Sequence, residues 1–253
     1  MRRRSFVAGS LSSLVLGALM GAIPRDAQAV GDESSERVAV LYFENQGNPE
    51  LEPLKVGLAQ MLITDLTGTP GVTVVERNQL QAILSELELG HSGKVSGDTA
   101  AKVGKLLGAR WLILGSYFEM MGTLRIDARL VRVETGEIVA SHGASGEAKA
   151  FMGLEKQLSG KLKGELTESV APTGTRSTPS ASGQSTPAVV EQPAGEVIVP
   201  PDAKELQAAV AFSEGLIYLD QEDLPRAREA FESAVAQNPD LDEAKTALAS
   251  LEL

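Results

Sequence analysis

Few side chains in this chain stand at spacings that catalysis requires. The sequence holds two histidines, His91 and His142, and neither has a carboxylate or a serine at a spacing typical of a nucleophile and its base. The run Gly90–Lys94 is similar to a phosphate-binding loop, but such a loop needs four residues between its glycines and Ser or Thr after the lysine. Here two residues separate the glycines and Val95 follows the lysine. We therefore predict a surface loop.

The composition points away from reactive and metal-bound chemistry. Cysteine is absent, so a thiolate ligand, a disulfide and an acylated Cys are all excluded, and two histidines argue against a histidine-rich metal site. Acidic residues number 34 against 23 basic ones, for a formal net charge of -11, which disfavours general binding to nucleic acid. We expect no catalytic, cofactor-binding or metal-binding residue, no cofactor and no nucleic-acid partner.

Two charged groups need an explanation of their own. Glu76-Arg77 could serve as an acid or an anion grip in a small-ligand or nucleotide site between Glu76 and Lys94. An ion pair between them that caps the next helix is the interpretation we favour, because perturbed charges are as often structural as functional. The alternation of Arg125, Asp127 and Arg129 is typical of the solvated face of a strand.

The elements that would position these residues alternate between strand-like and helix-like patterns over residues 37–170. Apolar, β-branched runs predict strands, whereas apolar residues three and four apart predict helices. In the strand over 123–133, every second residue from Leu124 to Leu130 should be buried. The fold class is α/β (α+β), a mixed β-sheet covered by helices. We predict strands over 38–43, 72–75, 111–121, 123–133 and 137–146, and helices over about 54–66, 80–87, from an N-cap at Asp98 to Gly108, and 151–170.

The first residues have the pattern of an export signal. Basic residues Arg2–Arg4 precede a mild apolar run, Phe6–Ile23, and Ala27–Ala29 supplies a small-x-small cleavage pattern. We predict a cleaved signal peptide over residues 1–29, a mature start at Val30 and a periplasmic protein, with Sec and twin-arginine export both left open. An uncleaved amphipathic anchor is the alternative.

The remainder of the chain divides into a linker and a helical module. Residues 171–201 hold six of the twelve prolines and predict a disordered linker, because they have no apolar periodicity. Residues 202–253 predict a small all-α helical hairpin. Six of its residues fall at the spacings of a tetratricopeptide (TPR) repeat, with a chance helical hairpin as the alternative. They are Gly215, Tyr218, Ala227, Phe231, Ala234 and Pro239.

One repeat with a capping helix is fewer than the three usually needed for independent stability. The module should therefore dock on its own globular domain, self-associate or recruit a partner. The resemblance to the repeat family implies a partner-binding face on the first helix, around Ala211, Glu214 and Tyr218.

Residues 37–167 resemble the CsgG family, envelope proteins that include the curli secretion channel subunit. Related folds occur in flagellar FlgO proteins and in the amino-terminal domain of the Tol translocation protein. The resemblance rests on RVAVLYFENQGNPELEPLKVGLAQMLITDL, GVTVVERNQLQAILSELEL, TAAKVGKLLGARWLILGSYFEM and LRIDARLVRVETGEIVASHGASGEA. It implies a non-enzymatic envelope protein that makes protein–protein contacts in assembly or secretion.

The alternative that this resemblance implies is a subunit of an oligomeric outer-membrane secretion channel. Lipid-anchored members of the family carry a Cys at the mature start, which this chain lacks. Each membrane strand would need about 9–11 residues, and the strands over 111–146 are expected to be used by the globular sheet. Length therefore disfavours the pore, while homo-oligomers and peripheral outer-membrane association stay open.

Overall fold

The computed structural model describes residues 35–89, 97–170 and 203–251. The predicted signal peptide, the loop at Gly90–Lys94 and the predicted linker lie outside the described residues. Contacts group the described elements in one unit, Ser34–Leu253. The division into residues 37–170 and 202–253 stays a prediction.

The described residues form one mixed six-stranded sheet of order β3-β1-β4-β5-β6, with β2 paired to β4. Parallel pairs join β1 to β3, β1 to β4 and β2 to β4, whereas β4, β5 and β6 run antiparallel over ten residues each. The strands are β1 (Glu36–Val40), β2 (Glu44–Asn45), β3 (Val72–Val74), β4 (Trp111–Met120), β5 (Thr123–Arg132) and β6 (Ile138–Glu147).

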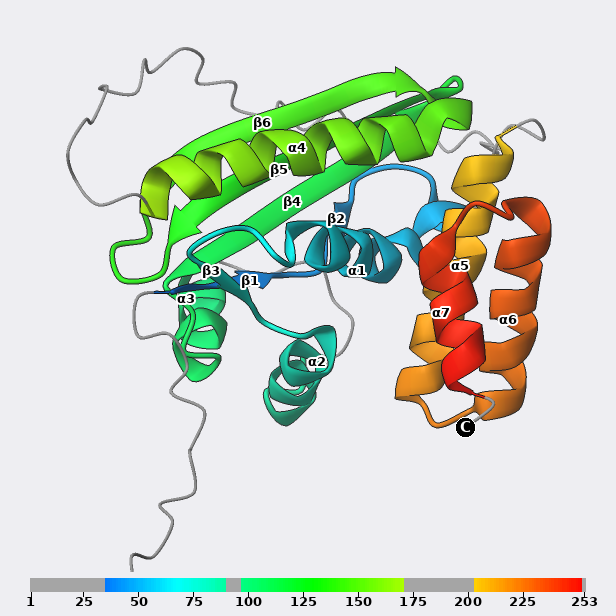
Figure 1. Ribbon diagram of the computed structural model, residues 1–253, viewed down its shortest axis with the longest axis horizontal. Helices are drawn as coiled ribbons and strands as arrows, with labels where there is room; N and C mark the ends of the chain where they lie inside the picture. The colour runs from blue at the N-terminus through cyan, green and yellow to red at the C-terminus, as the bar shows by residue number, and fades with distance from the viewer. Residues whose placement is uncertain (1–34, 90–96, 171–202, 252–253) are drawn as a thin grey trace, which may run out of the picture. The chain divides into compact units, whose positions relative to one another are not determined.

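Helices pack on both faces of this sheet. Helix α4 runs along β5 and β6 (Figure 1). Its Leu154 lies against Gly146, on the same face as Leu124. Helix α3 lies on the opposite face, where Gly104 lets it approach Leu112. The helices are α1 (Leu54–Leu66), α2 (Arg77–Glu86), α3 (Gly97–Leu106), α4 (Phe151–Val170), α5 (Lys204–Asp220), α6 (Leu224–Gln237) and α7 (Asp242–Ser250), with short 3-10 turns at Pro49–Leu51 and Ala148–Ala150.

The predicted fold class is confirmed. In β5, Leu124, Ile126, Ala128 and Leu130 are each 0% exposed, while Arg125 and Arg129 face outward. Strand alternation therefore sets a packed face toward α4 and an outer face, as expected for a half-buried sheet.

Three of the differences from the prediction have a clear structural reason. β1 ends at Val40, and the buried residues Leu41–Phe43 continue outside any strand. The ring of Phe43 lies where a side chain on Gly115 would stand, so Leu41–Phe43 packs against β4. Only part of this segment is hydrogen-bonded to β4, through the Leu41 amide and the Ile113 carbonyl. β2 consists of two residues, both polar, so no apolar pattern in the sequence predicted it. Asp98 is the second residue of α3, which begins at Gly97, and is therefore wrong as its N-cap.

Candidate functional site

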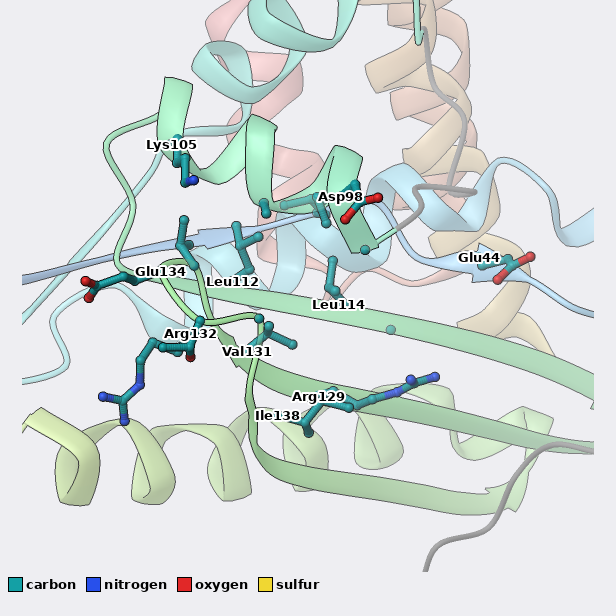
Figure 2. A pocket seen from close by; sticks show the side chains of 18 of the residues that line it. Glu44, Asp98, Lys105, Leu112, Leu114, Arg129, Val131, Arg132, Glu134 and Ile138 are labelled. Atoms are coloured by element: carbon teal, nitrogen blue, oxygen red, sulfur yellow. The ribbon is translucent and has the colours of Figure 1, made fainter.

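A cavity with a volume of about 560 Å³ lies on the outer face of the sheet. Helix α3 supplies one wall, β4 and β5 supply the floor, and the turn after β5 supplies the far wall (Figure 2). The floor is apolar because Leu112, Leu114 and Val131 alternate outward from their strands, beside Ile138 at the start of β6. A cavity of this size is within the usual range for ligand pockets, about 300–1,000 Å³.

Charges of both signs surround this floor. Lys105 and Glu134 lie on one side of Leu112 in Figure 2, while Asp98 and Glu44 lie on the other. The remaining lining charges are Arg129 and Arg132.

Arg132 is held in place by its neighbours at the pocket wall. Its guanidinium lies 5.0 Å from the centroid of the Trp111 ring, and its Nε lies 3.9 Å from Glu137 Oε2. Ser116 and Thr135 also line the cavity, and neither hydroxyl forms a hydrogen bond with a histidine or carboxylate in the described part of the chain. The lining of this pocket thus combines an apolar floor with charges of both signs.

Arg77 is paired with a different residue from the one predicted. Its Nη1 lies 2.6 Å from Asp220 Oδ2 on α5, and the two side chains are only 8% and 9% exposed. Glu76 stands at the N-cap of α2 but makes no side-chain capping bond, so the favoured Glu76–Arg77 ion pair is wrong. The buried tertiary partner replaces the local one, and no local pattern signals a contact across 143 residues.

Burial and charge at this contact act against each other. Desolvation lowers the pKa of Arg77, but the hydrogen bond and charge of Asp220 outweigh it, so that its pKa is raised and the guanidinium stays charged. Burial raises the pKa of the neighbouring Tyr42 to about 12, which keeps its phenol neutral. The Tyr42 hydroxyl donates a hydrogen bond of 2.8 Å to Oε1 of Gln81, a residue of α2. Together these groups join the loop after β1 to α2 and α5.

Helix α5 also packs closely on α1. A side chain on Gly57 would collide with Ser213 Oγ, and Ser213 is fully buried, donating to the Ala209 carbonyl at 2.6 Å. At the start of α4, the Met152 amide donates to Glu205 Oε2 of α5 at 3.0 Å. The helices α5–α7 thus contact the sheet-bearing part of the chain through α1, α2 and α4.

The predicted partner-binding residues differ in their exposure. Ala211 is 7% exposed, whereas Glu214 and Tyr218 are partly exposed. The Arg226 guanidinium lies 4.7 Å from the centroid of the Tyr218 ring, and burial raises the pKa of Glu214. The structure therefore leaves two of the three residues accessible, and their role in binding stays a prediction.

The six residues at repeat spacings lie on α5, α6 and the turn that follows. The Phe231 ring lies where a side chain on Gly215 would stand, and Ala227, Phe231 and Ala234 are each 0% exposed. Tyr218 is partly exposed, and Pro239 lies in the turn between α6 and α7. The close approach of α5 and α6 depends on the absent side chain at Gly215, while the tetratricopeptide assignment stays a prediction.

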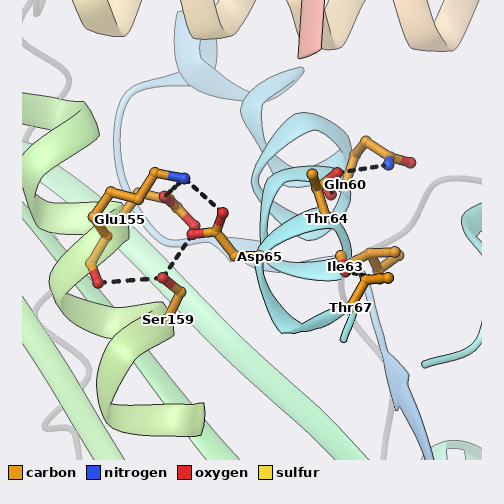
Figure 3. A network of polar contacts seen from close by, with 8 residues as sticks. Gln60, Ile63, Thr64, Asp65, Thr67, Glu155 and Ser159 are labelled. Carbon is orange, nitrogen blue, oxygen red and sulfur yellow. Dashed lines mark hydrogen bonds and ion pairs between the residues drawn. The ribbon is translucent and has the colours of Figure 1, made fainter. Parts of the chain in front are cut away.

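Sequence reasoning missed a buried acid on α4 (Figure 3). Glu155 is 0% exposed, and within the described part of the chain neither of its carboxyl oxygens has a hydrogen-bond partner. Its neighbour Asp65 on α1 accepts from Lys156 and, at 2.7 Å, from Ser159. Burial first, and then the charge of Asp65, raise the pKa of Glu155 to about 8, so the group is protonated at neutral pH.

The position of Glu155 could have been inferred from spacing. The predicted buried edge of α4 carries Phe151, Leu154, Leu158 and Leu162, and Glu155 stands one turn after the first of these and three residues before the third. A charged residue at such a position signals a buried polar contact across to α1.

Two further features are absent from the described residues. No helix there is both long and apolar enough to cross a membrane. No group of three or more His, Cys, Asp or Glu side chains in the described residues is arranged to hold a metal ion.

Comparisons with solved structures give low similarity scores. The LpoB carboxy-terminal domain from Salmonella enterica is 22% identical, with a TM-score of 0.38 over 47% of this chain and 88% of that one. TolB from Acinetobacter baumannii is 14% identical, with a TM-score of 0.37 over 53% of this chain and 29% of that one. A PelC dodecamer from Paraburkholderia phytofirmans is 15% identical, with a TM-score of 0.34 over 53% and 90%.

Two sequence comparisons each match part of the chain. A protein named putative adenylate cyclase 3, from Rhizobium meliloti (strain 1021), is 31% identical over 100 residues. The match takes in 39% of this chain but only 15% of that protein. Residues 25–120, which run from ahead of β1 to the end of β4, match the family model described as curli production assembly/transport component CsgG, and the predicted resemblance to the CsgG family is confirmed over that stretch.

Proposed function

We propose that this chain is a non-enzymatic protein of the bacterial cell envelope that works by protein–protein contact in assembly or secretion. The match of residues 25–120 to the CsgG family model carries the proposal, because that family is described as an assembly and transport component. The export pattern of residues 1–29 supports a periplasmic location, either free or peripherally bound to the outer membrane.

Two surfaces support an adaptor role. The cavity between α3, β4 and β5 combines an apolar floor with charges of both signs, which suits contact with a protein segment. Helices α5–α7 add a second surface that is tied to the first part of the chain by the buried Arg77–Asp220 pair. A chain built in this way can hold two partners, or one large partner, in a fixed relation.

Capture of partners in the native host tests the role of the helical module. After mild cross-linking, proteins retained by the full chain are compared with those retained by a Gly215→Leu/Ala227→Leu variant, in which bulk separates α5 from α6. Gly160→Leu on α4 is the control, because a side chain there meets open space. We expect the module variant to lose its partners and the control to keep them; identical profiles from all three chains would contradict the proposal.

A second candidate is a subunit of an oligomeric secretion channel, favoured by the word "transport" in the description of the matching family model. It requires tight membrane association and ring-shaped oligomers. The location and size of the native protein separate the two functions.

A further inference from the structure

A second cavity, of about 330 Å³, lies between α1, α5 and α7. Its walls come from both parts of the chain, so it exists only while α5–α7 contact α1. We call it the α1–α7 groove. It is lined by Gln60, Thr64, Phe212, Leu216, Asp242, Glu243, Thr246, Ala247 and Ser250.

The hydroxyl groups on the rim of the groove are already bonded within their own helices. Thr64 donates to the Gln60 carbonyl at 3.1 Å, Thr246 to the Asp242 carbonyl at 2.9 Å, and Ser250 to the Ala247 carbonyl at 2.6 Å. These donors are therefore not available to select a polar ligand. A ligand inside the groove would therefore contact mainly its apolar floor, which is made by Phe212, Leu216 and Ala247.

The charges on the groove are all of one sign. Its lining holds two carboxylates, Asp242 and Glu243, and no Lys or Arg. Asp242 is paired with Lys245 at 2.7 Å, on the same helix. Within residues 35–89, 97–170 and 203–251, Glu243 accepts no hydrogen bond and forms no ion pair.

The charged groups of α4 near Glu243 form no ion pair with it in the described part of the chain. Its charge acts on Glu155 and Lys156 of α4, but Lys156 is bound to Asp65 of α1. Within the described residues no cation lies at ion-pair distance from Glu243, and this carboxylate borders an apolar cavity, an arrangement that favours a ligand bringing both an apolar group and a positive charge.

We propose that the α1–α7 groove binds a segment of a partner protein whose apolar side chain enters the cavity and whose neighbouring Lys or Arg pairs with Glu243. This inference rests on the proposed function, because it names the chemistry of the partner segment. The volume is at the lower end of the range for ligand pockets, about 300–1,000 Å³, which suits a short anchor rather than a whole helix.

Fluorescence anisotropy with the full chain tests the groove. The probes are two labelled peptides of equal length that share their Leu positions and carry either Lys or Glu between them. We expect the Lys peptide to bind, with affinity falling as salt rises, and the Glu peptide not to bind. Glu243→Lys should weaken binding about tenfold, which corresponds to ~1.4 kcal/mol.

A matched control separates the groove from the acidity of the whole chain. Glu232→Lys makes the same change of charge on an exposed position of α6, outside the groove, and should alter the affinity less than about twofold at moderate salt. Ala247→Phe, which fills the cavity without altering charge, should abolish binding while its thermal melt shows a folded chain.

Three results would overturn the inference: equal losses in Glu243→Lys and Glu232→Lys, equal binding of the two peptides, or no binding of the Lys peptide at millimolar concentration. The groove and the adaptor role fail separately. If Ala247→Phe keeps every cross-linked partner that Gly215→Leu/Ala227→Leu loses, the groove is not the binding site and the adaptor role stands.

Discussion

At the scale of single residues, Glu155 ties the stability of the chain to pH. The folded state keeps this proton up to about pH 8, whereas a free glutamate releases it near 4.5. Between these values the folded state binds more protons than the unfolded state, so the free energy of unfolding falls as pH rises. This loss of stability is absent below about pH 4.5 and complete above about pH 8, where it reaches about 5 kcal/mol as an upper limit.

Chemical denaturation from pH 5 to pH 9 measures this effect. Glu155→Gln stands in for the protonated acid, so it should match the native chain near pH 5 and be the more stable of the two near pH 9. Glu168→Gln, an exposed position on the same helix, should follow the native curve. Parallel curves for the native chain and Glu155→Gln would show that Glu155 ionises normally.

The second residue-scale prediction concerns the Arg77–Asp220 pair. Removing one partner leaves the other charge buried and alone, so Arg77→Leu or Asp220→Asn should each lower the free energy of unfolding by about 3–5 kcal/mol. The double variant should lose much less than the sum, because no lone charge remains. The exposed Lys245–Asp242 pair should show little coupling in the same cycle. Additive losses at Arg77 and Asp220 would contradict the pairing.

Sequence reasoning performed unevenly at this scale. The alternation from Leu124 to Leu130 predicted which side chains are buried, because a strand's period of two is a local property. The sequence led us to pair Arg77 with its neighbour Glu76, and this prediction was wrong. The true partner, Asp220 on α5, depends on how helices distant in the sequence pack. Glu155 was missed for a related reason, because a charged residue on a helix is usually solvated.

At the scale of elements, the contact between α1 and α5 depends on one missing side chain. Gly57→Ala places a methyl group against Ser213 Oγ, so we expect a loss of about 1–3 kcal/mol in the free energy of unfolding. Ser213→Gly in the same chain should recover part of that loss, because it removes the atoms that the methyl group meets. Gly160→Ala on α4 meets open space and should be neutral or slightly stabilising.

Differential scanning calorimetry of the four chains provides the readout. If Gly57→Ala costs no more than Gly160→Ala, or if Ser213→Gly recovers nothing, α1 and α5 do not approach each other at Gly57. The same comparison shows whether the α1–α7 groove has the walls described for it.

Elements were more predictable than their partners. Each long strand and helix of the sheet-bearing part has a periodic apolar pattern, and the structure places an element at each one. The exceptions are informative. β2 consists of the two polar residues Glu44–Asn45, which pair with β4 and have no apolar pattern. Leu41–Phe43 has a strand-like composition and is buried, but it lies outside the strands, although the Leu41 amide still donates to the Ile113 carbonyl of β4.

At the scale of the whole molecule, the sequence allowed three roles for the helical module, and the structure shows its first helix in contact with α1, α2 and α4. The close packing at Gly57 and the buried Arg77–Asp220 pair could not be predicted, since each joins residues more than 140 positions apart. The pocket on the outer face was also beyond prediction, because its lining comes from α3, from strands β2, β4, β5 and β6, from the loop after β1 and from the turn after β5.

The most direct test of the central claim is fractionation of the native host's envelope, with an alkaline carbonate wash and sizing of the released protein. We expect a mature chain that leaves with the periplasmic fraction, or is released from the outer membrane by the wash, and migrates as a small species. A chain that stays in the outer membrane through the wash and runs as a large detergent-solubilised ring would contradict the account and favour the secretion channel.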